Sequence, residues 1–220
     1  MLEVSAIAAD MFVDRGFTAT NVADIAAAAG VSSRTFHRYF DAKEDAVVPF
    51  LEEGWKSYVA AVDHRPVDES LLESLIHALD GSFRSVSASS YRDLIAILPD
   101  SAPLQRVWLQ IHEDCQQAMQ PVITRRLALT GQNLRARFVA ACIVAANRIA
   151  AEMWASDPTT SSRETVEKCL SMIEIAVLEP SPITSNGEPR ETARRKSGAH
   201  HRSGAWTGAS RSTDVGRGGC

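Results

Sequence analysis

The stretch from Ala26 to Phe40, AAAAGVSSRTFHRYF, constrains the fold of this chain more than any other. Ahead of it, Val22, Ile25 and Ala26 repeat with the period of a short amphipathic helix. Gly30 supplies the left-handed backbone conformation that lets a chain leave a helix in a tight turn. A second short helix follows at once. The pattern therefore predicts a helix-turn-helix, a shape that fits the major groove of DNA.

Polar residues stand where the two short helices should begin. Asn21 is placed to cap the first helix, with Asp24 three residues on, as in a loose capping box. Ser32 or Ser33 is placed to cap the second helix. These caps set the start of each helix on either side of the turn.

The second helix has two chemically distinct faces. At about 100° per residue, Arg34 and Arg38 lie roughly 40° apart, with His37 beside them. Phe36 and Phe40 point the other way, so we expect them to be buried. Arginine reaches guanine edges bidentately, and Ser, Thr, His and Tyr side chains suit phosphates or bases. These features favour DNA binding over an ordinary amphipathic surface helix.

The expected DNA contacts come from this motif and the residues around it. They are Asn21, Ser32, Ser33, Arg34, Thr35, His37, Arg38, Tyr39 and Lys43. We expect the two arginines to read bases and Lys43 to contact phosphate.

These segments resemble the TetR family of bacterial repressors. The family's usual pattern is an alanine-rich first helix ending LF-x-x-x-G-[FY], then T-[TV]-x-x-IA-x-x-AGVS, then T-[LF]-[YF]-x-[YH]F-x-x-K. The resemblance runs from Val4 to Phe50. Its matching segments are AADMFVDRGF (Ala8–Phe17), TNVADIAAAAGVS (Thr20–Ser32) and RTFHRYFDAKEDAV (Arg34–Val47).

Two features depart from the family pattern. His37 replaces an aromatic residue that touches backbone phosphate in the family, a contact that histidine can also make. Only Met1–Glu3 precede the first helix, where many relatives carry a basic arm. The chain either binds without that arm or starts at a misassigned methionine.

The resemblance implies a homodimer on a palindromic double-stranded DNA operator. The last two helices of each subunit would pair with their symmetry mates, and a small hydrophobic effector would release the DNA. The segment RTFHRYFDAKEDAV looks like actinobacterial members, some of which sense acyl-CoA or other hydrophobic molecules. An orphan DNA-binding regulator without an effector stays open as the alternative.

Charge and composition narrow the class of protein. The net charge is −4, but residues 180–220 hold seven Arg/Lys against three Asp/Glu, which leaves −8 on residues 1–179. A small basic footprint on an acidic body favours specific, salt-sensitive DNA binding. No run of about 18 apolar residues and no signal peptide is found, so we expect a cytoplasmic protein without a membrane partner.

Sequence motifs give no support for catalysis. The chain has no paired Glu-x-x-His motifs, no G-x-S-x-G, no Walker loop and no dinucleotide fingerprint, so we expect no enzyme, no cofactor and no metal. The four cysteines lack a C-x-x-C pair and fit small buried side chains in a reducing cytoplasm.

The rest of the chain has helical and not strand periodicity. Expected helices run from about Lys43 to Val62 and then over Glu69–Val86, Tyr91–Leu98, Leu104–Leu129, Asn133–Ala155 and Arg163–Leu178. With the first three, they predict an all-α protein of about nine helices. Pro121 should kink or split the helix that contains it. Phe138–Ala151 is apolar nearly all round, so it should be covered on both sides.

We expect three parts along the chain. A helix-turn-helix DNA-binding domain covers residues 1–45, and a helical ligand-binding and dimerisation domain covers residues 46–179. Residues 180–220 form a tail with seven of the twelve glycines and almost no aliphatic side chain. Such a segment buries too little surface to fold, so we expect it to be disordered.

Polar and amphipathic residues inside the apolar helices are candidates for an effector pocket. They are Trp108, His112, Gln116, Asn147, Arg148 and Trp154. The tryptophans also fit a packed core, and His112 also fits a solvated acidic face. Asn147 and Arg148 are harder to explain that way, because they interrupt a helix with no polar face. The sequence does not identify the ligand.

Overall fold

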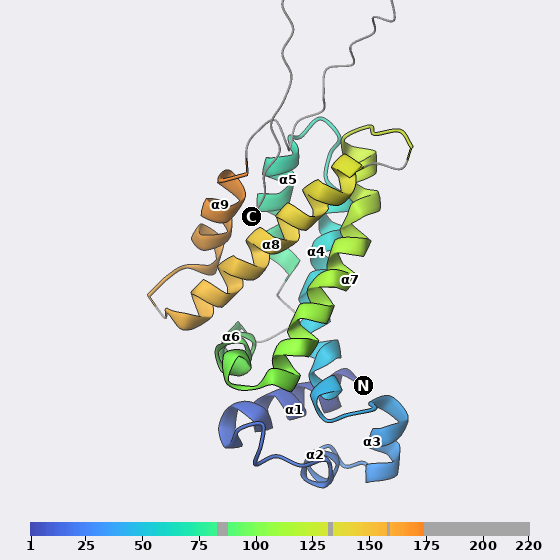
Figure 1. Cartoon of the computed structure of the whole chain (residues 1–220), viewed down its shortest axis with the longest axis vertical. Helices are drawn as coiled ribbons and strands as arrows, with labels where there is room; N and C mark the ends of the chain where they lie inside the picture. The colour runs from blue at the N-terminus through green and yellow to red at the C-terminus, as the bar shows by residue number, and fades with distance from the viewer. Residues whose placement is uncertain (83–87, 132–133, 158, 174–220) are drawn as a thin grey trace, which may run out of the picture. The chain divides into compact units, whose positions relative to one another are not determined.

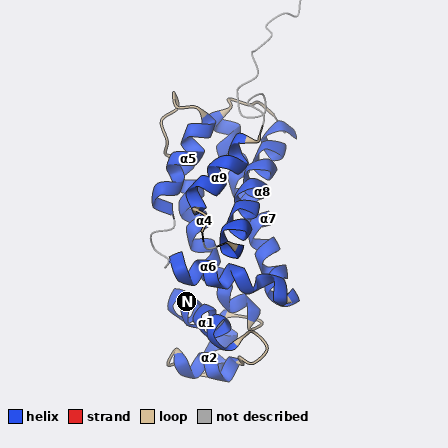
Figure 2. Ribbon diagram, turned by 90° about the vertical axis from the view of Figure 1, so that its left-hand side faces the viewer, coloured by secondary structure: helices blue, strands red, loops and turns tan. Residues whose placement is uncertain are grey.

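The protein is all-α, as expected. A computed structural model describes residues 1–82, 88–131, 134–157 and 159–173. In these residues it has nine α-helices, two short 3-10 helices and no strand (Figures 1 and 2). The α-helices are α1 (Leu2–Arg15), α2 (Val22–Ala28), α3 (Ser33–Tyr39), α4 (Val48–Asp63), α5 (Leu71–Ser82), α6 (Ala88–Ile97), α7 (Ala102–Arg126), α8 (Leu134–Ser156) and α9 (Ser162–Ser171). The 3-10 helices are η1 (Glu44–Val47) and η2 (Leu98–Asp100).

Helices α1 to α3 form the expected helix-turn-helix unit. Phe12 of α1 and Phe36 of α3 are fully buried in a core that continues into the later helices. Thr20 donates from its hydroxyl to the carbonyl of Gly16 at 3.0 Å, which closes the turn after α1. Gly30 has a φ of 65°, so the left-handed turn predicted between α2 and α3 is confirmed.

The helix expected from about Lys43 begins later than predicted. Residues 44–47 form η1, and regular α4 starts at Val48, with Pro49 in its first turn. Proline has no N–H to donate, and the first turn of a helix is where a backbone N–H has no intrahelical acceptor, so Pro49 fits the start of α4.

Pro121 does not split the helix that contains it. Helix α7 runs through Pro121 for 25 residues, so of the expected kink or split the split is wrong, and the kink stays a prediction. Pro121 cannot donate to the carbonyl of Gln117, but both residues are exposed, and water can satisfy that carbonyl.

Helix α8 packs on α7 and on α9, as the labelled ribbons in Figure 1 show. Its other side is open, since Phe138 is 56% exposed, so within the described residues the expected covering of both sides is missing.

The described residues all belong to one compact unit, Met1–Pro182. A division at residue 45 therefore stays a prediction. The end of the last expected helix, up to Leu178, and the tail at 180–220 lie outside the described residues.

Candidate nucleic-acid interface and effector cavity

Helix α3 carries its basic side chains on the outside. Arg34, His37 and Arg38 are exposed, while Phe36 is fully buried and Phe40 is 5% exposed. The two phenylalanine rings pack with their centroids 5.1 Å apart. The predicted separation of a cationic face from an aromatic face is confirmed, and the cationic face is open to a partner.

Arg38 is oriented by its neighbour Tyr39, which is itself 40% exposed. The Arg38 Nη2 donates to the Tyr39 hydroxyl at 3.1 Å, and the guanidinium carbon lies 5.0 Å from the centroid of the Tyr39 ring. The pair therefore presents a guanidinium group and a phenol together at the end of α3.

The small polar residues of the motif act as helix caps. Asn21 Oδ1 accepts from the Asp24 N–H at 3.0 Å, as expected. Of the two serines, Ser32 is the cap of α3, since its Oγ accepts from the Thr35 N–H at 3.0 Å. Ser33 is exposed at the first position of α3. Contacts of these residues with DNA stay predictions.

Lys43 is placed differently from what we expected. Its Nζ donates to the carbonyls of Phe17 and Thr20, at 2.6 and 2.8 Å, and its side chain is only partly exposed. The ammonium group therefore has two acceptors inside the motif, and its third N–H leaves the phosphate contact expected from the sequence as a prediction. We therefore assign Lys43 to holding the loop between α1 and α2.

Buried contacts join the helix-turn-helix to the helical part. At the start of α4, the Phe50 N–H donates to the buried Ser5 Oγ of α1 at 2.9 Å. The Phe50 ring lies 6.2 Å, between centroids, from the Tyr91 ring of α6, and α6 also packs on α1. Helix α6 therefore contacts the helix-turn-helix directly through α1.

A second junction lies at the start of α7. The Arg106 guanidinium is 3.5 Å from a carboxylate oxygen of each of Glu44 and Asp45 in η1. Arg106 is exposed, so this ion pair is worth little by itself. It nevertheless places a cation of the helical part beside the segment that follows α3.

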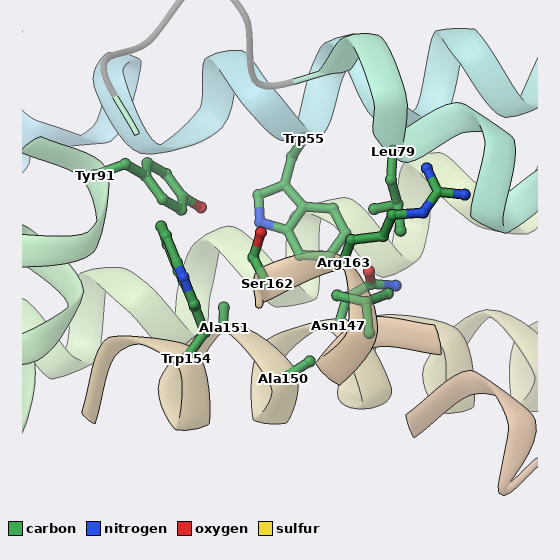
Figure 3. A pocket seen from close by; sticks show the side chains of 10 residues that line it. Trp55, Leu79, Tyr91, Asn147, Ala150, Ala151, Trp154, Ser162 and Arg163 are labelled. Carbon is green, nitrogen blue, oxygen red and sulfur yellow. The ribbon is translucent and has the colours of Figure 1, made fainter. Parts of the chain in front are cut away.

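A cavity of about 180 Å³ lies among five helices of the helical part. It is lined by Trp55 of α4, Leu79 of α5, Tyr91 of α6, Asn147, Ala150, Ala151 and Trp154 of α8, and Ser162, Arg163 and Val166 of α9. Figure 3 shows these side chains gathered around one space. Three of them are large aromatic residues from three different helices, so the cavity is mostly apolar.

The wall of this cavity contains an unpaired hydrogen-bond donor. Trp55 is 3% exposed, and its Nε1 finds no acceptor among the described residues. In Figure 3 this nitrogen lies on the ring edge that is turned towards Tyr91 and Trp154. A buried donor left unpaired costs about 1–3 kcal/mol, so an acceptor placed in the cavity would recover this free energy.

Two other polar groups of the lining, on Asn147 and Arg163, have partners. Asn147 Nδ2 donates to the Ile143 carbonyl at 2.9 Å, and Arg163 Nε donates to a Glu167 carboxylate oxygen at 2.7 Å. The Tyr91 phenol is neutral at pH 7, since burial raises its pKa further above the ordinary value of 10. The lining therefore offers no unpaired charge among these groups.

Two of the six candidate ligand residues, Asn147 and Trp154, line this cavity. Trp108 and Arg148 lie instead in a separate hollow, where the Trp108 Nε1 and the Arg148 Nη1 both donate to Glu152 at 2.9 Å. Gln116 is half-buried on α7 and is not among the lining residues.

His112 is a core side chain behind Trp55, and not part of a solvated face. His112 is 5% exposed, and the centroid of its ring lies 5.1 Å from that of the Trp55 ring. Its Nδ1 lies 2.8 Å from the carbonyl of Trp108, which can only accept, so Nδ1 carries the proton. Burial lowers its pKa to about 4, against the opposing effect of that hydrogen bond, and the ring is neutral at pH 7.

Sequence reasoning missed Trp55 and Tyr91 as wall residues. Both stand at apolar positions of amphipathic helices, where an aromatic residue of a packed core would also stand. The spacing along one helix contains no signal for a cavity that five helices enclose together.

Comparisons with known proteins agree with this geometry. Residues 6–47 match the family described as bacterial regulatory proteins, tetR family. The chain is 24% identical over 156 residues to the HTH-type transcriptional regulator TcmR of Streptomyces glaucescens, covering 67% of this chain and 69% of TcmR. It is 36% identical over 93 residues to the HTH-type transcriptional repressor KstR2 of Rhodococcus jostii, covering 39% of this chain and 46%, less than half, of KstR2.

A solved structure extends the likeness to the fold of the helical part. A crystal structure assigned to a TetR-family transcriptional regulator from Syntrophomonas wolfei superposes with a TM-score of 0.59 at 19% identity. The superposition covers 77% of this chain and 90% of that one, so it includes helices well beyond the helix-turn-helix.

Proposed function

Because the chain belongs to the TetR family of bacterial DNA-binding transcription regulators, we propose that it is a homodimeric repressor of a palindromic operator. A small, largely apolar molecule that enters the helical part releases the DNA. The aromatic-walled cavity carries this proposal, because one of its walls, α6, packs on α1 of the helix-turn-helix.

The exposed face of α3 supports operator binding. Arg34 and Arg38 have the geometry for bidentate contacts to guanine edges in the major groove. One helix-turn-helix buries too little surface for tight binding, whereas a two-fold dimer places two recognition helices in successive major grooves, about 34–36 Å apart. The operator is therefore a palindrome.

The open side of α8 supports a homodimer. Four apolar side chains there are 44–83% exposed: Leu134, Phe138, Ile149 and Met153. At about 100° per residue they fall within roughly 100° of the helix circumference, so they form one stripe. Exposed apolar patches of this kind mark interaction surfaces.

Helix α8 is also, by length and composition, the one helix in the described part of the chain that could cross a membrane. Its opposite side packs on α7 and α9, as in a core helix. We therefore assign the exposed stripe to a second copy of this chain.

Release of the DNA follows from linkage between the two sites. An effector shifts the equilibrium only by as much as it prefers the released arrangement to the DNA-bound one. A ligand that pushes on Tyr91 moves α6 and, through Phe50 and Ser5, the position of α1. In a dimer this changes the distance between the two recognition helices, which the operator fixes.

A DNA-binding regulator without an effector is the alternative function. The size of the cavity favours this effector-free regulator, since its volume of about 180 Å³ is below the roughly 300 Å³ of common ligand pockets. A buried cavity of roughly 150 Å³ can nevertheless bind benzene, so the volume admits a small ligand.

Selection of bound sequences from random DNA with the full-length protein tests the proposal. We expect enrichment of one palindrome, and sedimentation of a dimer at micromolar concentration. Small apolar molecules are then screened for release of that DNA. A monomer in solution, or the absence of any enriched sequence, would contradict the repressor; enrichment without release by any compound would favour the effector-free regulator.

A further inference from the structure

We propose that the cavity binds a neutral aromatic molecule of one or two rings, and that a hydrogen-bond acceptor on this molecule binds the indole N–H of Trp55. The inference rests on the proposed function, because it assigns a ligand class to the cavity that would hold the effector. It excludes the long acyl chains that the sequence resemblance offered as candidates.

The size of the cavity sets the size of the ligand. Its volume of about 180 Å³ is close to that of a cavity of roughly 150 Å³ that accommodates benzene. Its walls come from five helices, with Ala150 fully buried among them and with the exposed Ser162 and Arg163 of α9 at its open side. A molecule of one or two rings fits this space, whereas an extended acyl chain needs a longer channel.

The shape of the walls favours a flat ligand. Trp55, Tyr91 and Trp154 reach the space from α4, α6 and α8, and Figure 3 shows the three rings around it. Ring–ring contacts in edge-to-face or offset geometry add stabilisation beyond the burial of apolar area. A flexible chain gains no such contact and loses more conformational freedom when it is bound.

Trp55 defines the polar group that the ligand carries. Its buried Nε1 has no acceptor among the described residues, and it faces the space between Tyr91 and Trp154. An indole N–H can only donate, so the complementary group is an acceptor such as a ring nitrogen or a carbonyl oxygen. An apolar ligand of the same shape would leave this donor unpaired.

The lining favours a neutral ligand. The cation of the lining, Arg163, donates from its Nε to a Glu167 carboxylate oxygen at 2.7 Å. The Tyr91 phenol is neutral, and burial raises its pKa further. Behind Trp55, His112 is neutral as well, because burial lowers its pKa to about 4. A charged ligand would lose its hydration without gaining an unpaired counter-charge here.

Two bicyclic probes of the same shape test the acceptor. Quinoline carries a ring nitrogen that accepts a hydrogen bond, and naphthalene does not. Calorimetric titration at pH 7.5 gives the affinity of each for the full-length protein and for Trp55→Phe, which removes the donor. We expect the ratio of quinoline affinity to naphthalene affinity to fall about three- to tenfold in this variant, the usual effect of one hydrogen bond.

Two further variants show where the probes bind. Trp108→Phe also shortens a buried tryptophan, but its Nε1 bonds to Glu152 and it does not line the cavity, so we expect an unchanged ratio. Ala151→Leu fills the cavity, and we expect both probes to lose at least tenfold in affinity. If Trp55→Phe does not fold, one indole N–H proton resonance of the unaltered protein should move downfield with quinoline and not with naphthalene.

The outcomes separate this inference from the proposed function. An unchanged ratio in folded Trp55→Phe, or 1-octanol binding more tightly than both bicyclic probes, overturns the inference. If 1-octanol binds more tightly than both probes and also releases the selected palindrome, the inference about the ligand class is wrong. The proposed repressor function is then still supported. Quinoline that binds through Trp55 without releasing DNA supports the ligand class and contradicts the release mechanism.

Discussion

Lys43 donates from its ammonium group to the backbone carbonyl of Phe17 at 2.6 Å, and the same group lies 4.0 Å from the centroid of the Phe17 ring. The two residues are 26 positions apart in the chain. A second hydrogen bond, to the carbonyl of Thr20 at 2.8 Å, completes the arrangement. Lys43, which lies shortly after the end of α3, therefore holds the loop between α1 and α2 in place.

We expect Lys43→Ala to lower the free energy of unfolding by about 1–3 kcal/mol, because two charge-assisted hydrogen bonds are lost from a partly buried place. Affinity for all DNA sequences should fall together as the motif loosens. The dependence of log affinity on log salt should change by less than the ~0.9 expected for one lost phosphate contact. Urea unfolding and DNA titrations at several salt concentrations measure both effects.

Lys56→Ala is the matched control for this substitution. Lys56 has a 71% exposed side chain and pairs with Glu52 on α4, away from the loop. It should leave both stability and DNA affinity nearly unchanged. If Lys43→Ala changes the slope of log affinity against log salt by about one unit and leaves the free energy of unfolding unchanged, Lys43 contacts a phosphate.

Arg34 and Arg38 are expected to read the operator. Alanine at either position should weaken binding, and at least one substitution should relax base preference by about 1–3 kcal/mol at one position, the value of a bidentate guanine contact. Competition with operators altered base by base measures this. Arg125→Ala, at the far end of α7 beside Asp63, is the control for losing one cation. Two arginine variants with unaltered base preference would disprove our assignment of the faces.

Phe138→Glu should separate the subunits. Phe138 is 56% exposed on α8, so the change does not disturb the core of one chain, but it places a charge in the proposed interface. We expect monomers in sedimentation at micromolar concentration, weak DNA binding and unchanged helix content. Leu109→Glu, at a 51% exposed position of α7, is the control and should stay dimeric. A dimeric Phe138→Glu protein would mean that another surface pairs.

The parts of the fold that could be predicted from the sequence are those set by local chemistry. Asn21 and Ser32 cap helices through bonds that span only three residues, and Gly30 marks the turn because few other residues adopt a positive φ. Pro121 shows the limit of this reasoning, since a proline on an exposed side of a long helix does not have to end it.

The parts that could not be predicted depend on contacts between distant segments. The hydrogen bonds of Lys43 to the carbonyls of Phe17 and Thr20 could not be predicted, because a pattern of side chains does not show which backbone carbonyls lie nearby. The cavity residues Trp55 and Tyr91 are 36 positions apart and look like ordinary core residues, and only the packing of five helices leaves space between them.

His112 should make the protein lose stability in mild acid. Its pKa is 6.5 in an unfolded chain, and burial lowers it to about 4 in the folded protein. Between these pH values the unfolded state binds more protons, so stability falls as the pH falls, by about 3 kcal/mol in total at about 1.36 kcal/mol per pH unit. His112→Gln cannot titrate, so its unfolding free energy, measured with urea from pH 7 to pH 4, should vary less than that of the unaltered protein. The exposed His64, replaced by Gln, is the control and should keep the original pH dependence. An unaltered pH dependence in His112→Gln would show that this imidazole is not held neutral in the core.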